Sequence, residues 1–232
     1  MSLRLDNNKL KTKEIELSQK ILRGYINQFG YIETNKEKLM NIKLLVLIIT
    51  LMLPSTGFTK ENAYVIDQSH FSLGFLVEHA GYAKTLGMFR HIDGSFNHDD
   101  EKNKITNVII NVNTESVYTN HDERDSHLRG PDFLNVEKFP KMTFAVDNVE
   151  ITDNETLISG KLTLLGITKD INLTGKINKI AKYPFGFSPP VVIGVSARGN
   201  FKRSDFGMMY AIKKNLVGDV IELIIEFEAR QQ

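Results

Sequence analysis

From residue 60 onward, apolar and polar side chains alternate along most of the chain. Phe71, Leu73, Phe75 and Val77 fall on one face of an extended segment, opposite polar neighbours such as Ser72. The same period of two returns at residues 108–112, 142–146, 158–164, 171–177, 191–197 and 221–227. A period of two places one face of each strand in a core and the other in water, which is typical of antiparallel sheets.

Turn-forming residues separate these segments, at 99–103, 153–154, 165–167 and 184–190. Seven or more strands over about 170 residues predict an all-β domain, either a closed barrel or a sandwich. We favour the antiparallel β-barrel, because the glycines within the strands suit strongly coiled strands. These glycines are Gly74, Gly94, Gly175 and Gly194.

One segment, near residues 120–138, departs from the alternation and predicts a short helical crossover. Asn120 stands three residues before Glu123, which is the spacing of a capping box at a helix start. Acidic Asp122 and Glu123 would then lie in the first turn, where the helix dipole favours them. Gly130 and Pro131 end the predicted helix.

The first 59 residues carry a different pattern. Residues 44–53, LLVLIITLML, contain Thr50 as their only polar member and are too short to span a bilayer, which takes about 20 apolar residues. Lys43 precedes this run and small residues follow it, as in a secretory signal. A start at Met40 makes residues 40–59 a signal peptide and 60–232 the mature domain, which we expect to be periplasmic or secreted.

Residues 1–39 precede this signal, and two interpretations remain open. The first is an over-extended start, with translation beginning at Met40. The second is a cytoplasmic tail on an uncleaved anchor. Mass spectrometry of the mature N-terminus distinguishes the two interpretations, because a product that begins near Lys60 excludes an uncleaved anchor.

Composition and charge narrow the possible functions. The chain has 29 Lys and Arg against 28 Asp and Glu, and it lacks the basic excess of a nucleic-acid-binding protein. Without residues 1–59 the counts become 20 and 23, so the net charge changes from +1 to −3. The absence of cysteine excludes disulfides, thiol nucleophiles and Cys-based zinc sites.

Two polar groupings are candidates for chemistry. All six histidines lie between residues 70 and 127, but their spacing matches no helical metal motif, and we expect no metal. Arg124, Asp125 and His127 could act as an acid–base set, which leaves an extracytoplasmic enzyme acting on a lipid or small molecule as the alternative function. A polar network that locks the crossover onto the barrel is the simpler interpretation.

Four ordered blocks resemble the YceI-like family. One begins at Tyr64-Val65-Ile66-Asp67 with His70, another is Gly160-Lys161-Leu162-Thr163-Leu164-Leu165-Gly166-Ile167-Thr168-Lys169, and a third is Arg203-Ser204-Asp205-Phe206-Gly207-Met208. The longest contains Thr114-Glu115-Ser116-Val117-Tyr118-Thr119, His121, Arg124-Asp125-Ser126-His127-Leu128-Arg129, Asp132-Phe133-Leu134 and Phe139-Pro140-Lys141-Met142-Thr143-Phe144. The resemblance covers residues 63–229.

This resemblance implies a lipocalin-like barrel of about eight strands that binds a polyisoprenoid, such as a quinone or prenyl lipid, without being an enzyme. The ligand is then transported, stored or sequestered outside the cytoplasm, and no cofactor is needed besides the bound lipid. A membrane redox partner and a second copy of the chain are further candidate partners, whereas nucleic acid is not.

The candidate site has two parts. The apolar sleeve consists of inward-facing strand residues: Phe75, Val77, Phe89, Phe96, Ile110, Val112, Phe144, Leu164, Val195 and Ile225. The polar rim, which is the candidate site for a head group, consists of Arg124, Asp125, His127, Asp132, Arg203 and Asp205.

Overall fold

The computed structural model describes residues 13, 16–21, 23–24, 61–152 and 154–232. The chain divides into two compact units, Met1–Phe58 and Thr59–Gln232. The described residues of the first unit are helical. The predicted signal segment, residues 40–59, lies outside the described residues. Within the described part of the chain, no helix is long and apolar enough to cross a membrane.

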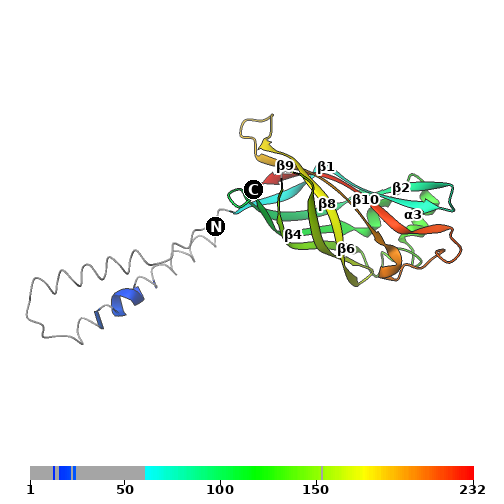
Figure 1. The fold of residues 1–232 in the computed structure, drawn as a ribbon, viewed down its shortest axis with the longest axis horizontal. Coiled ribbons are helices and arrows are strands. Elements are labelled where there is room, and N and C mark those ends of the chain that lie inside the picture. Colours follow the sequence, from blue (N-terminus) through cyan, green and yellow to red (C-terminus); the bar gives the residue numbers. More distant parts are fainter. Residues whose placement is uncertain (1–12, 14–15, 22, 25–60, 153) are drawn as a thin grey trace, which may run out of the picture. The chain divides into compact units, whose positions relative to one another are not determined.

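The second unit is one antiparallel sheet that closes on itself, as Figure 1 shows. The strands of the closed barrel, in spatial order, are β1 (Glu61–His79), β10 (Val217–Gln231), β9 (Val191–Lys202), β8 (Ile167–Lys182), β7 (Thr156–Leu164), β6 (Lys141–Glu150), β4 (Lys104–Asn113) and β3 (Ile92–Asp99). The pairing of β1 with both β10 and β3 closes the ring. The predicted all-β barrel of about eight strands is confirmed.

Shorter elements gather at one end of the barrel. β2 (Ala83–Phe89) pairs with the second half of β1, and β5 (Val117–Tyr118) pairs with β2. The helical elements are η1 (Thr114–Ser116), α3 (Asp122–Arg129) and η2 (Arg203–Phe206). Figure 1 shows β2 and α3 at the end opposite the C-terminus. We call the end with β2 and α3 the mouth.

The other end of the barrel is filled by side chains. Tyr64, Phe96, Ile193 and Ala229 are buried there in one cluster, and the Tyr64 and Phe96 rings stack with centroids 5.5 Å apart. Phe227 packs against Phe96 from the interior side, at 6.4 Å. The sleeve therefore has a closed end and a mouth.

An irregularity in β1 explains why its alternation is clear only from Phe71 onward. The register with β10 shifts between Ile66 and Phe71, so residues 67–70 form a bulge. The Asp67 carboxylate accepts hydrogen bonds from Ser69 N at 2.9 Å and from Arg230, and it lies 2.7 Å from His70 Nδ1. This network holds the bulge in place.

The bulge should respond to pH through His70. The hydrogen bond with Asp67 raises the pKa of His70 above 6.5, although desolvation opposes this. Burial disfavours ionisation of Asp67, but hydrogen bonds from His70, Ser69 and Arg230 outweigh it and hold the pKa of Asp67 below 3.8. The His70 contribution to stability is complete below pH 6.5 and is lost as pH rises through the raised pKa; the Asp67 contribution is lost as pH falls through the lowered one.

We therefore expect Asp67→Asn to return the pKa of His70 toward 6.5, as measured by an NMR titration of the imidazole ring. An unchanged His70 titration in this variant would contradict the assignment of the shift to Asp67.

The helical crossover forms where predicted, but its capping differs. The N-cap is His121, whose Nδ1 accepts from Arg124 N at 3.4 Å, and Asn120 lies one residue outside the helix. Asn120 adopts a left-handed conformation with φ 60°, and its side-chain oxygen accepts from the Tyr118 hydroxyl at 2.8 Å. The predicted capping box from Asn120 is wrong, because the tight turn uses Asn120 for its positive φ. Gly130 ends the helix as predicted.

Candidate ligand-binding site

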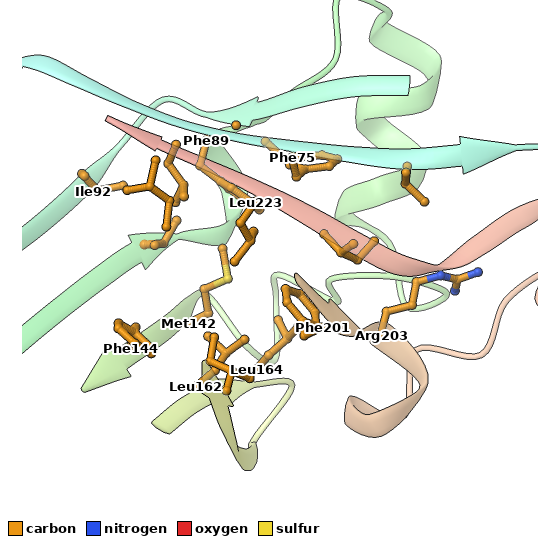
Figure 2. A pocket seen from close by; sticks show the side chains of 18 of the residues that line it. Phe75, Phe89, Ile92, Met142, Phe144, Leu162, Leu164, Phe201, Arg203 and Leu223 are labelled. Atoms are coloured by element: carbon orange, nitrogen blue, oxygen red, sulfur yellow. The ribbon is translucent and has the colours of Figure 1, made fainter. Parts of the chain in front are cut away.

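A cavity of about 530 Å³ occupies the barrel interior. Its walls are mostly aliphatic and aromatic side chains from the barrel strands, and Figure 2 shows Phe89, Met142 and Leu223 directed into the same space. This volume is within the usual range of about 300–1,000 Å³ for small-molecule sites. Small barrels either fill their interior or hold one ligand, and this barrel has the second arrangement.

All ten residues predicted for the apolar sleeve line this cavity. They do so because strand alternation turns every second side chain inward. The cavity is also lined by apolar residues that the prediction omitted. Some lie on the same strand faces and follow the same alternation, namely Leu73, Leu162 and Leu223. Others come from irregular segments with no periodic signal, namely Phe133, Leu134, Tyr210 and Leu216.

Arg124 is a charged residue of the cavity lining at the mouth. Its Nε donates to Thr119 Oγ1 at 2.7 Å, and its Nη2 donates to the Thr119 carbonyl at 2.6 Å. Within the described part of the chain, its Nη1 has no hydrogen-bond partner. Thr119 therefore fixes the guanidinium while leaving donors for a ligand.

His127, one helical turn further along, also lines the cavity. Its Nε2 lies 3.0 Å from the Asp132 carboxylate, and its ring packs edge-on to Phe133 and Tyr210, with centroids 5.0 Å from each. Asp132 orients this imidazole but does not itself line the cavity. An aromatic cluster with one polar edge thus lies at the mouth.

Arg203 lines the cavity but has little capacity left for a head group. Its side chain is 1% exposed, and its three nitrogens donate to the carbonyls of Met208, Tyr210, Val217 and Gly218 at 2.7–2.9 Å. Figure 2 shows the guanidinium directed away from the labelled apolar side chains. Burial lowers the pKa of Arg203, and Asp219 opposes that effect. Arg203 joins the segment after η2 to the start of β10.

Asp125 and Asp205 do not line the cavity either. Asp125 is 3% exposed, and its Oδ1 accepts from Thr119 N at 2.8 Å and from Thr119 Oγ1. Asp205 is exposed on the outside of the barrel. The structure therefore leaves Arg124 and His127 as the rim residues that can reach a head group.

Asp125→Asn should destabilise the domain by about 1–3 kcal/mol, because a neutral amide oxygen accepts the two Thr119 hydrogen bonds without the charge of the carboxylate. Urea unfolding measures this change. Asp122→Asn, at an exposed position in the same helix, is the matched control and should change stability by about 0.5 kcal/mol or less. Equal losses in the two variants would contradict the structural role of Asp125.

The acid–base set considered from sequence is not assembled. In the described structure, no hydrogen bond joins the side chains of Arg124, Asp125 and His127, because Asp125 faces Thr119 and His127 pairs with Asp132. Asp67, His70 and Glu228 have ligand atoms within 4.8 Å of one another, the spacing of a metal-binding group. Arg230 already supplies the positive charge on Asp67, however, so this group is better explained as the bulge network.

Comparisons with known proteins agree with this architecture. The model of the YceI-like domain matches residues 64–229. Protein YceI of Salmonella arizonae is 36% identical over 195 residues, which is 83% of this chain and 100% of the relative. The crystal structure of the Campylobacter jejuni YceI protein is 30% identical and aligns with a TM-score of 0.58, over 67% of this chain and 90% of that one.

A more distant structure shares the fold. A polyisoprenoid-binding domain from Saccharophagus degradans is 13% identical and aligns with a TM-score of 0.55, covering 74% of this chain and 99% of its own. The family model and the Salmonella relative together cover most of the barrel and its strands. This chain belongs to the YceI-like family.

Proposed function

We propose that this protein binds a polyisoprenoid, such as a quinone or prenyl lipid, inside the barrel and transports, stores or sequesters it outside the cytoplasm. The observation that carries the proposal is the apolar cavity of about 530 Å³, closed by aromatic side chains at one end and bordered by Arg124 and His127 at the other. A long apolar tail with one polar end matches this distribution. The distant polyisoprenoid-binding domain with the same fold supports the choice of ligand class.

Burial of the tail supplies the driving force. Removing each CH₂ from water contributes about 0.8 kcal/mol, so several isoprene units contribute more than 10 kcal/mol before opposing terms are counted. Ordering the flexible tail and removing it from its membrane offset much of this gain. The resulting affinity is moderate and reversible, as a carrier requires.

Arg124 and His127 define the head groups that fit. The free Nη1 of Arg124 offers charge-assisted hydrogen bonds to an acceptor such as a quinone carbonyl or a phosphate. Arg124→Gln should therefore weaken binding of geranylgeranyl phosphate by about tenfold and leave geranylgeraniol almost unaffected. An equal loss of affinity for both ligands would contradict a head-group role for Arg124.

Location outside the cytoplasm rests on the signal predicted from Met40. The whole Salmonella relative aligns with this chain, and the aligned length exceeds the domain matched at residues 64–229. Because only three residues follow residue 229, most of the excess lies upstream, in the region that contains residues 40–59. The alignment with the relative therefore extends upstream of the barrel, which supports the assignment of a segment ahead of it.

Thermal unfolding with geranylgeraniol as the probe tests ligand binding. A ligand at 100 times its dissociation constant stabilises the folded state by about 2.7 kcal/mol, which raises the Tm of a domain this size by roughly 5–10 °C. Hexadecanol serves as the straight-chain comparison. If neither compound raises the Tm of delipidated protein, the proposal fails.

Two other roles make different predictions. A carrier that delivers its lipid to a membrane redox partner should crosslink to that partner. An enzyme that uses His127 should lose activity on His127→Ala while its lipid occupancy is unchanged. The separation of Arg124, Asp125 and His127 into different contacts favours the binding role.

A further inference from the structure

Two loops form one side of the mouth. The first, residues 79–86, consists of the end of β1, the turn 80–82 and the start of β2, and the second, residues 207–217, runs from η2 to the first residue of β10. Ala80 N donates to the Leu216 carbonyl at 3.0 Å, and His79 is paired with Val217. The loops are therefore one connected structure, which we call the mouth loops.

Apolar side chains of the mouth loops extend into water. Tyr82 is 91% exposed, Met209 is 52% exposed and Leu216 is 47% exposed. Leu216 and Tyr210 also line the cavity, so apolar surface continues from the outside of the rim into the interior. An exposed apolar surface that continues into a cavity is typical of a site that contacts a membrane, a protein or a ligand.

The charges on the mouth loops have one sign. Residues 79–86 and 207–217 contain Lys84, Lys213 and Lys214 and no Asp or Glu. Lys84 pairs with Glu222, whereas Lys213 and Lys214 form no ion pair with any described residue. The carboxylates of this end lie on other elements, such as Glu78 on β1 and Asp122 on α3.

Contact with a membrane would speed the exchange of the proposed ligand. Each CH₂ that passes through water on the way out slows release by about fourfold, so a tail of many carbons would exchange very slowly by diffusion. Direct contact between the mouth and a bilayer removes this barrier. Apolar side chains beside unpaired lysines are the surface that an anionic bilayer interface attracts.

We propose that the mouth loops dock on a bilayer containing anionic phospholipid, so that the tail passes directly between the membrane and the cavity. This inference rests on the proposed function for the nature of the cargo, but docking itself can be measured without cargo. The occupant of the surface is the lipid bilayer, not a second copy of the chain.

The closed end of the barrel offers a matched control. The loop between β8 and β9 carries Phe185, which is 74% exposed, and Phe187, which is fully exposed. Lys182 and Val191 flank this loop and pair with each other. The next residue, Val192, pairs with Arg230 near the end of β10. Removal of these two aromatic side chains takes away a similar apolar area far from the mouth.

Three variants of the full chain, processed as in its host, separate the possibilities. Tyr82→Ser/Met209→Ser removes apolar contacts of the mouth loops, and neither residue lines the cavity. Lys213→Glu/Lys214→Glu reverses their charge. Phe185→Ser/Phe187→Ser is the control. Flotation of lipid-free protein with phosphatidylglycerol vesicles measures docking, and transfer of dansyl-labelled farnesol into the same vesicles measures exchange.

We expect vesicle binding and the transfer rate each to fall by about tenfold in both mouth-loop variants. Both quantities should stay unchanged in the control. In all three variants the equilibrium affinity for the probe should be within about twofold of wild type. The transfer rate of the wild type should increase with vesicle concentration and should be slower into phosphatidylcholine. Loss of binding in the control alone, a rate independent of vesicle concentration, or a change of oligomeric state in place of vesicle binding would overturn the inference. Vesicle binding by a protein that takes up no farnesol would refute the proposed function and leave docking supported.

Discussion

Arg203→Met should lower the free energy of unfolding by about 3–5 kcal/mol. The Arg203 side chain is 1% exposed and donates to four backbone carbonyls, those of Met208, Tyr210, Val217 and Gly218. Methionine fills much of the same space but has no N–H donor, so these carbonyls lose their partner. Each unsatisfied buried polar group costs about 1–3 kcal/mol, and relaxation of the loop toward water reduces the total.

The loss of Arg203 should loosen one segment of the mouth before it unfolds the whole domain. Without Arg203, the segment at Met208–Tyr210 is no longer joined to the start of β10, so its amides should exchange with deuterium faster than those of β8. Lys202→Met, at the exposed neighbouring position, is the matched control and should change stability by about 0.5 kcal/mol or less. Equal stabilities of the two variants in urea would show that Arg203 does not hold the mouth together.

Ile225→Trp should abolish most binding of the isoprenoid while the barrel stays folded. Ile225 lines the cavity from β10, where it is paired with Leu73 of β1 and Ala197 of β9. An indole at this position extends into empty space instead of displacing packed side chains, so filling the cavity should cost little stability. We expect the affinity for geranylgeraniol to fall at least about tenfold, which corresponds to the loss of two buried CH₂ contacts or more.

The chain contains no tryptophan, so the introduced indole also reports on its surroundings. Its emission should be blue-shifted, as expected inside an apolar cavity. Ile224→Trp is the matched control, because adjacent strand residues face opposite sides of the sheet and Ile224 does not line the cavity. Retention of full affinity in Ile225→Trp would place the ligand outside the barrel.

The strand positions and the apolar sleeve were predictable because burial on one face leaves a direct mark on the sequence. Val195 and Ile225 could be assigned to the interior from alternation alone, although their partners across the sheet, Phe227 and Ala197, lie far away in the sequence. The bulge at residues 67–70 interrupts that signal, so alternation does not identify the first half of β1 as strand.

The polar rim was less predictable, because a charged residue type does not reveal what its side chain contacts. Asp125 comes from the same motif block as Arg124, and Arg203 from another polar block, yet both are occupied by internal hydrogen bonds. Tyr210 lines the mouth from an irregular loop, where its position depends on the tertiary contacts of Arg203 and His127. Periodicity carries no information on such contacts.

The most direct test of a lipid-binding barrel is the lipid that the protein carries when purified from its native host. Extraction followed by mass spectrometry should find an isoprenoid in near-stoichiometric amount with the wild type and with Ile224→Trp. The same extraction should find little or none with Ile225→Trp. Wild-type protein that carries no lipid, or equal amounts of lipid in the two tryptophan variants, would contradict the account.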